Sequence, residues 1–328
     1  MYDRGNFISS DARGNLIIFS SERNKVITKF NFYKKKFKKI EKKINIVLDE
    51  DIVYVSDNLG FIYAFDYIKG KILWAKDVKA PFRSNLKIKD NKLIAADQNN
   101  NIYLLNKKNG KTLKLIPTED SKIKNNFKNS FSHNKDLIFF LNTYGSLYAI
   151  NNNNNQIRWV LNLNKSLDLN PSNLFNGNQI ISNEDVIIVT SQDATYVIDS
   201  LSGTIKKKFN MISQIKPLIL NHYLFLVTSN NFLISINLKS GEIIYSYDIN
   251  KEIADFLKIK KKKAIFKSIM IANNKILILL KNSYFLELDI NGKIKNVFKL
   301  PKKIYSDLIF IDNTILYLSR KNKFIILG

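Results

Sequence analysis

Short apolar runs alternate with polar clusters along the whole chain. The runs are about five to seven residues long, and the clusters between them are rich in Asn, Asp, Gly and Lys. Runs of this length bounded by turn residues are typical of β-strands joined by hairpins. Helices of a repeat protein would need apolar residues at i, i+3, i+4 and i+7, and these segments alternate instead. The pattern therefore predicts an all-β fold.

A unit of this pattern recurs with a regular period. It is clearest at residues 60–74, where one strand ends at Asp66, a glycine follows at Gly70, and a second strand reaches Trp74. The residue that follows the third strand of each repeat can be identified eight times: Ser20, Asp66, Asn106, Asn151, Asp199, Asn237, Asp289 and Gly328. The mean separation is about 44 residues, and such a period is typical of β-propellers with one four-stranded blade per repeat. We therefore expect residues 1–328 to form a single domain, an eight-bladed β-propeller of four-stranded antiparallel blades.

The first and last repeats are both incomplete. Residues 6–10 read as a second strand, and residues 323–327 read as a third strand. We therefore expect blade one to lack its inner strand and blade eight to lack its outer strand. The missing strands would leave unpaired sheet edges, which favour aggregation, and one upstream segment could fill both gaps. We therefore expect the chain to be N-terminally truncated, with a signal or lipoprotein segment upstream of Met1.

Two strongly basic stretches, residues 33–43 and 250–265, interrupt the period. The second contains Ile253, Phe256 and Leu257 at near-helical spacing, which predicts a short surface helix. Each stretch is interpreted either as a tolerated solvent-exposed insertion or as a site for a partner.

Composition and charge limit the kinds of binding and catalytic site that the chain can form. Cysteine is absent, which excludes disulfides and thiolate sites, and His133 and His222 are too few for a His-rich zinc site. The formal net charge is +24, but lysine supplies nearly all of it, whereas specific phosphate and base contacts favour arginine. We therefore expect a solvated basic surface and no specific nucleic-acid site. No apolar run reaches the ~18 residues of a membrane-spanning helix.

One segment carries a family resemblance. The sequence Ala64-Phe-Asp66-Tyr-Ile-Lys-Gly70-Lys-Ile-Leu-Trp74 resembles the tryptophan-docking motif of the pyrroloquinoline-quinone-like (PQQ-like) propeller family. A second copy contains Ala149, Asn151 and Trp159, with Asn155 in place of its glycine. The resemblance implies that these seven residues are structural blade-docking positions: Ala64, Asp66, Gly70, Trp74, Ala149, Asn151 and Trp159.

Each motif position has a physical reason. We expect the alanine to be small enough for the indole of the next blade to lie over its strand. An Asp or Asn side chain can bond backbone amides of the turn, and glycine takes the positive φ needed there. The tryptophan is expected to be buried between adjacent blades.

The resemblance also bears on catalysis. Family members that are quinoprotein dehydrogenases hold their cofactor with a calcium site, a stacking tryptophan and often a vicinal disulfide. This chain has no cysteine, and both of its tryptophans occupy docking positions. No nucleophile elbow, phosphate-binding loop or metal-ligand helix is present either. We therefore expect no catalytic residues, no cofactor and no metal site.

Over its full length the chain resembles the eight-bladed propeller lipoproteins of the outer-membrane β-barrel assembly machinery. It implies a non-enzymatic scaffold that is periplasmic and outer-membrane-associated, a monomer within a hetero-complex. Its expected partners are a barrel-assembly subunit and unfolded barrel proteins, with peripheral contact to the membrane. One alternative is a ligand-binding or sensory propeller whose axial funnel takes an anionic ligand; the other is a quinoprotein dehydrogenase. The candidate funnel-lining residues are Arg83, Ser84, Lys128, Lys216, Lys267 and Ser306.

Overall fold

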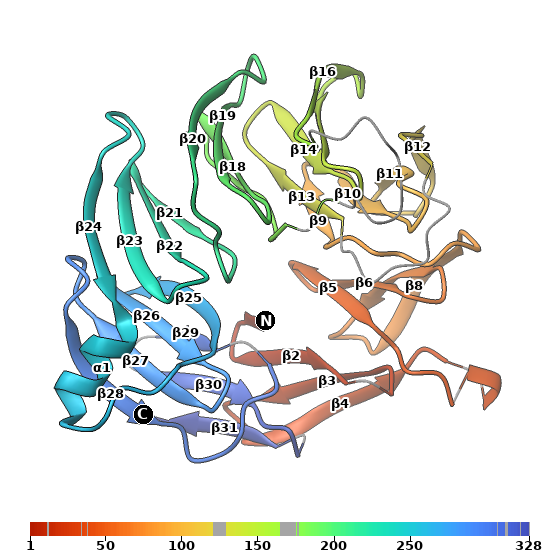
Figure 1. The fold of residues 1–328 in the computed structure, drawn as a ribbon. Coiled ribbons are helices and arrows are strands. Elements are labelled where there is room, and N and C mark those ends of the chain that lie inside the picture. Colours follow the sequence, from red (N-terminus) through yellow and green to blue (C-terminus); the bar gives the residue numbers. More distant parts are fainter. Residues whose placement is uncertain are drawn as a thin grey trace. The chain divides into compact units, whose positions relative to one another are not determined.

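A computed structural model describes most of the chain. The described residues are 1–11, 13–33, 35–37, 39–120, 129–164, 175, 177–306, 308–311, 314–321 and 323–327. They fall into two compact units, Met1–Phe175 and Asn176–Gly328. Lys128 lies outside the described residues. Each unit contains four sheets, and each sheet corresponds to one predicted repeat (Figure 1).

The first unit holds blades 1 to 4. Blade 1 comprises β1 (Tyr2–Asp3), β2 (Asn6–Ser10), β3 (Asn15–Ser20) and β4 (Lys25–Asn31), and blade 2 comprises β5 (Ile44–Asp49), β6 (Ile52–Asp57), β7 (Phe61–Asp66) and β8 (Lys71–Asp77). Blade 3 comprises β9 (Lys87–Lys89), β10 (Lys92–Ala96), β11 (Ile102–Asn106) and β12 (Thr112–Ile116), and blade 4 comprises β13 (Ser130–His133), β14 (Leu137–Leu141), β15 (Ser146–Asn151) and β16 (Ile157–Asn162).

The second unit holds blades 5 to 8. Blade 5 comprises β17 (Ile181–Ser182), β18 (Val186–Thr190), β19 (Thr195–Asp199) and β20 (Ile205–Phe209), and blade 6 comprises β21 (Leu218–Leu220), β22 (Tyr223–Val227), β23 (Phe232–Asn237) and β24 (Ile243–Asp248). Blade 7 comprises β25 (Phe266–Ala272), β26 (Lys275–Leu280), β27 (Tyr284–Leu288) and β28 (Ile294–Lys299), and blade 8 comprises β29 (Ile309–Ile311), β30 (Thr314–Leu318) and β31 (Phe324–Leu327).

Within each blade the strands pair in sequence order and are antiparallel throughout. In blades 1 to 7 the register between the third and fourth strands shifts once, always at the same point of the repeat, as between Ala64 and Phe65 or between Ala149 and Ile150. A shift of this kind is a β-bulge, which increases the local twist of a sheet. The fold is thus all-β, an eight-bladed β-propeller, as the period predicted.

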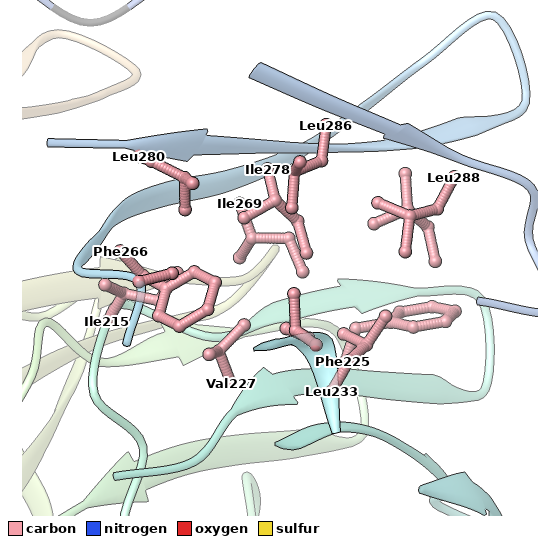
Figure 2. Close-up of a cluster of buried hydrophobic side chains, with 13 residues drawn as sticks. Ile215, Phe225, Val227, Leu233, Phe266, Ile269, Ile278, Leu280, Leu286 and Leu288 are labelled. Atoms are coloured by element: carbon pink, nitrogen blue, oxygen red, sulfur yellow. The ribbon is translucent and has the colours of Figure 1, made fainter. Parts of the chain in front are cut away.

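The hydrophobic core consists of layers between consecutive blades. One cluster joins Ile8 and Ile18 of blade 1 to Val53 and Phe65 of blade 2, and similar clusters lie between blades 2 and 3 and between blades 3 and 4. In the second unit, Figure 2 shows the layer between blades 6 and 7, where Phe225 faces Leu288 and its neighbours. In blades 2 and 3 the second and third strands are buried, because a neighbouring blade packs against each face of the sheet. Fourth strands consist mostly of exposed and half-buried residues, since they form the outer edge.

The two end blades differ from each other. We expected blade 1 to lack its first strand, and this needs correction: β1 occupies that place, although it has only two residues. The hairpin forms because Arg4 and Gly5 both adopt positive φ, 41° and 76°, which suits a two-residue hairpin turn. In the described part of blade 8 there are three strands, as expected, and the outer one is lacking.

The two basic stretches contain helical turns. Residues Lys35–Phe37 form a 3₁₀ helix. The predicted surface helix is present as α1 (Ile249–Leu257), directly after β24. Asp248 caps its N-terminus by accepting hydrogen bonds from the backbone N–H groups of Asn250 and Lys251 at 3.0 and 3.2 Å.

Candidate functional site

The turn between the third and fourth strands has a common construction. The side chain at the end of the third strand accepts hydrogen bonds from backbone N–H groups two to four residues later, as Asp66 does from Lys69 at 2.8 Å and Asn151 from Asn153 at 2.8 Å. This Asx-type bond replaces the strand pairing that the turn interrupts. Asn106, Asp199, Asn237 and Asp289 make the equivalent bonds.

The alanine of the motif lies in a cross-strand row within its own blade. Ala64 pairs with Tyr54 on one side and with Trp74 on the other, and the rings of Tyr54 and Trp74 are 6.1 Å apart across it. Blade 4 repeats the row with Phe139, Ala149 and Trp159, whose rings are 6.2 Å apart. We expected the alanine to make room for an indole from the next blade. Instead it brings two aromatic rings of its own blade together, because a larger side chain would separate them.

The tryptophan itself reaches the next blade. The indole of Trp74 lies against Gly110 of blade 3, so closely that a Cβ added to Gly110 would stand 2.6 Å from Trp74 Cε3. The Trp74 Nε1–H group donates a hydrogen bond to the carbonyl oxygen of Lys107 at 2.9 Å. Trp74 is half-buried, and Trp159 is half-buried as well. Both were expected to be buried, but the fourth strand is the outer edge and leaves part of each ring exposed.

Other residues make the same contact where tryptophan is missing. Tyr245 of blade 6 lies against Gly292 of blade 7, and its hydroxyl donates to the carbonyl oxygen of Ile290 at 3.2 Å. Ile290 follows Asp289 just as Lys107 follows Asn106, so the two bonds are equivalent. In blade 5 the aliphatic stem of Lys207 covers Gly241 in the same way. In contrast, nothing lies within 4 Å of the corresponding site at Gly70.

Asn155 replaces the glycine of blade 4. Its φ is 57°, close to the 71° of Gly110. Asn tolerates this left-handed conformation better than other side chains do. The backbone N–H of Asn155 donates to the Asn151 carbonyl at 2.9 Å, as the N–H of Gly110 does to Asn106 at 2.8 Å. The substitution therefore preserves the turn.

A second set of polar residues, which the sequence analysis did not identify, ends the second strands. Asp57 is fully buried, and its Oδ1 accepts from the N–H groups of Leu59 and Phe61 at 2.9 Å each. Asp11, Asp97 and Asn142 hold the equivalent turns of their blades. Tyr33 donates its hydroxyl to Asp57 Oδ2 at 2.7 Å. Burial outweighs these hydrogen bonds and raises the pKa of Asp57 above its usual value. The signal in the sequence was an Asp or Asn four or five residues before the third strand of blades 1 to 4.

Glu119 is a half-buried acid on the connection from blade 3 to blade 4. Its carboxylate accepts from Ser146 Oγ at 2.6 Å, from Asn142 Nδ2 at 2.5 Å and from the Tyr148 hydroxyl. Burial opposes ionisation, but the three donors together hold the pKa of Glu119 below its ordinary value. This carboxylate therefore stays ionised and ties the connection to blade 4.

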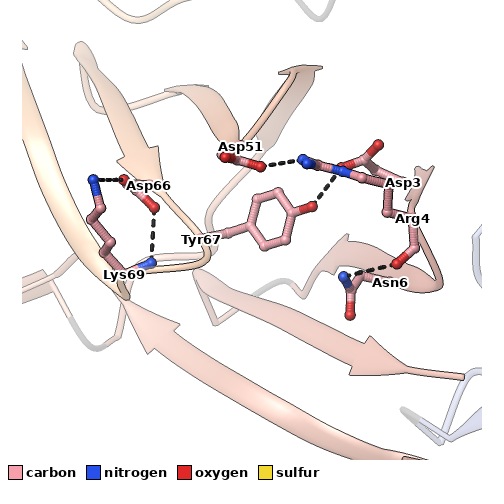
Figure 3. A network of polar contacts seen from close by, with 7 residues as sticks. All are labelled: Asp3, Arg4, Asn6, Asp51, Asp66, Tyr67 and Lys69. Atoms are coloured by element: carbon pink, nitrogen blue, oxygen red, sulfur yellow. Dashed lines mark hydrogen bonds and ion pairs between the residues drawn. The ribbon is translucent and has the colours of Figure 1, made fainter. Parts of the chain in front are cut away.

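Blades 1 and 2 are also joined by a polar network (Figure 3). Arg4 contacts Asp3 at 3.0 Å and also pairs with Asp51 of blade 2. Tyr67 donates its hydroxyl to Asp3 at 2.5 Å. Asp3 and Arg4 flank the short first hairpin, so this network holds the start of the chain against blade 2.

The candidate funnel residues have structural contacts. Ser84 is buried, and its Oγ accepts the N–H of Ala96 at 2.7 Å; Ser306 Oγ accepts the N–H of Leu318 at 2.9 Å in the same role. The Nζ of Lys267 donates to the Ser306 carbonyl at 2.5 Å. Burial lowers the pKa of Arg83. Arg83 and Ser84 belong to one unit, and Lys216, Lys267 and Ser306 belong to the other.

Within the described ranges, no three His, Asp or Glu side chains are grouped so that they hold a metal ion. The helices found there include none with the length and apolar character needed to cross a membrane. The arrangement as a whole stabilises blade packing and presents exposed loops and outer strands.

The repeat, the turn construction and the docking contacts define a PQQ-like eight-bladed propeller. The family model described as outer membrane protein assembly factor BamB matches residues 12–247. The chain therefore belongs to this family. No curated protein matches the chain in sequence.

Solved structures share the fold at low sequence identity. BamB from Moraxella catarrhalis has a TM-score of 0.76 and 12% identity, with 99% of this chain and 94% of that chain covered. The C-terminal WD40 domain of Sif2 has a TM-score of 0.69 and 10% identity, with 99% and 92% covered. The dihydro-heme d1 dehydrogenase NirN has a TM-score of 0.67 and 11% identity, with 98% and 70% covered. The fold is therefore found both in an assembly factor and in a dehydrogenase.

Proposed function

We propose that the chain is a non-enzymatic scaffold for protein–protein interaction that assists the assembly of outer-membrane β-barrel proteins. In this proposal it works in the periplasm at the outer membrane, as a monomer within the Bam complex. Its partners are the barrel-assembly subunit and unfolded barrel proteins, and its own contact with the membrane is peripheral. The observation that carries the proposal is the family match over residues 12–247.

The physical properties of the chain support this role. Two acidic side chains with perturbed pKa values, Asp57 and Glu119, are engaged in structural hydrogen bonds. Fold alone does not determine function. The proposal therefore depends on the family match, and on the structural hydrogen bonds in which these acidic side chains are engaged. Scaffolds require a rigid framework with exposed loops, and blade packing supplies that framework.

Affinity purification from detergent-solubilised outer membranes tests the proposal. A tagged chain is expected to recover the barrel-inserting subunit in stoichiometric amount after mild cross-linking. An equally tagged periplasmic protein of another fold is the control. If the subunit is recovered no better than with the control, the proposed function is wrong.

An enzymatic alternative is tested separately. The purified chain is supplied with calcium, pyrroloquinoline quinone, an artificial electron acceptor, and a panel of alcohols and sugars. We expect no turnover above the background of the free cofactor. Turnover that saturates with substrate would show that the chain is an enzyme.

A further inference from the structure

The second basic stretch forms a defined surface element, here called the basic loop. It comprises α1 and the segment that follows it, residues 249–265. Five of the six residues Lys258–Lys263 are lysine, and all six are exposed. Acidic residues in the loop are limited to Glu252 and Asp255. The loop thus carries a net charge of +4, from six lysines and two acidic residues.

Several hydrogen bonds hold the basic loop in place. Lys258 ends α1 in the left-handed conformation, and the N–H of Ile259 donates to the Ala254 carbonyl at 3.0 Å. Lys261 forms an ion pair with Asp248, the N-cap residue, at 2.5 Å. The side chain of Asn250 accepts the N–H of Ala264 at 2.8 Å, which closes the loop. Its ends are therefore fixed, and its surface is preformed.

Apolar side chains stand exposed among the lysines. The exposed fractions are 45% for Phe256, 51% for Ile259 and 53% for Ile265. The opposite side of α1 is anchored, since Ile249 and Ala254 are buried. Exposed apolar side chains occur elsewhere on the chain as well, but here three of them lie on the same short element as six lysines, which makes the basic loop amphipathic.

We infer that the basic loop binds the surface of a membrane that contains anionic phospholipid. Lysine ammonium groups are attracted to the negative headgroups, and each contributes roughly 1 kcal/mol near such a surface, which corresponds to about a fivefold change in affinity. Phe256, Ile259 and Ile265 then enter the boundary between headgroups and acyl chains, as the apolar face of an interfacial helix does. Nucleic acid shares the phosphate chemistry, but it gives aliphatic side chains no apolar layer to enter, so the exposed isoleucines favour a membrane.

This inference deepens the proposed function, because it assigns the peripheral membrane contact to one element of the chain. It rests on the proposed function in one respect, the identity of the membrane that the loop binds. Vesicle binding by the purified chain requires no barrel-assembly subunit. Failure of this test and failure of the purification test are therefore distinguishable.

Cosedimentation with vesicles tests the charged part of the inference. The full chain is expected to bind vesicles of phosphatidylglycerol and phosphatidylcholine, and not vesicles of phosphatidylcholine alone. The double variant Lys262→Gln and Lys263→Gln should bind on the order of 20-fold more weakly. The matched control is Lys239→Gln with Lys293→Gln, which removes the same charge from exposed turns that precede fourth strands. An equal loss in both variants would overturn the assignment to the basic loop.

A second pair of variants tests the apolar part. Ile259→Thr with Ile265→Thr should weaken vesicle binding by about tenfold, because the methylene groups that enter the bilayer are lost. Ile205→Thr with Ile244→Thr is the control, since these outer-strand residues are 45% and 52% exposed and lie outside the loop. In a Phe256→Trp variant, quenching by brominated lipid should show insertion. Unchanged vesicle binding by Ile259→Thr with Ile265→Thr would overturn the inference. So would absence of this quenching together with displacement of the vesicles by a short DNA duplex, since that result indicates non-specific binding to phosphates.

Discussion

The contact between Trp74 and Gly110 provides a sharp test of how the blades are held together. The perturbation is a double-mutant cycle that combines Trp74→Ala with Gly110→Ala. In the folded chain the Trp74 ring occupies the space that a Cβ on residue 110 would need, with Cε3, Cδ2 and Cζ3 at 2.6, 2.8 and 3.1 Å from it. Removal of the ring should therefore relieve the clash that the second substitution creates.

The structure sets the magnitudes. Truncation of a fully buried tryptophan costs about 3–5 kcal/mol. Trp74 is only half-buried, which lowers the cost of truncating it, whereas loss of its hydrogen bond to the Lys107 carbonyl adds about 1 kcal/mol to that cost. We expect about 2–4 kcal/mol for Trp74→Ala. Gly110→Ala should cost about 1–2 kcal/mol for its positive φ and about 1–3 kcal/mol more for the clash. The double variant should be about 1–2 kcal/mol more stable than the sum of the two single effects predicts.

Urea unfolding followed by far-ultraviolet circular dichroism measures the four free energies without using tryptophan as the reporter. Gly70→Ala is the matched control. Gly70 has a similar positive φ of 66°, but nothing lies within 4 Å of its added Cβ. This control should cost only the backbone term, and it should not couple to Trp74→Ala. A coupling energy below about 0.5 kcal/mol between Trp74 and Gly110 would refute the docking contact.

Four other predictions follow from the same structure. Tyr245→Phe should cost about 0.5–1.5 kcal/mol in urea unfolding, because its hydroxyl bonds the Ile290 carbonyl. Asp57→Asn should retain the turn, as Asn142 does, and cost less than about 1 kcal/mol of unfolding free energy at pH 7. Because the pKa of Asp57 is raised in the folded chain, the stability of the unsubstituted chain relative to this variant should fall as pH rises above 3.8. The Lys206 hydrogen bond lowers the pKa of Asp199 to about 2, so Lys206→Met should raise that pKa toward 3.8 in an NMR titration. The pair should contribute less than about 1 kcal/mol to the free energy of unfolding above pH 4, and this contribution should be lost as pH falls through 2. Binding to nucleic acid should be independent of sequence and should vanish by about 0.2 M salt in a filter-binding assay.

The repeat spacing carried most of the information about the fold. Blade number, strand order and the turn role of Asp66 and its equivalents all follow from spacing and turn chemistry, because each blade is a local unit of four consecutive strands. The helix α1 was also predictable from the spacing of Ile253, Phe256 and Leu257. These features depend on residues that are close together in the chain.

What the sequence did not predict depends on contacts between strands or blades. The place of Ala64 between Tyr54 and Trp74 follows from the register of three strands. The donors around Glu119 come from residues 142–148, on the blade that follows it. The partial exposure of Trp74 depends on its position on a fourth strand, which the motif alone does not specify. The two-residue strand β1 formed because Arg4 adopts positive φ, a conformation that arginine seldom takes.

The docking position explains why the motif can be lost while the propeller remains. Trp74, Lys207 and Tyr245 differ in charge and shape, yet each covers a glycine of positive φ in the next blade. At these three junctions a long side chain with an apolar stem lies over that glycine, and a donor to the turn carbonyl strengthens the contact where the side chain has one. Gly70 has no such cover. Substitution at this position is therefore compatible with the fold, so the motif residues report on packing and not on a partner. Features that blade packing does not require are better candidates for function, and the basic loop is one of them, because its lysines and isoleucines stand exposed together.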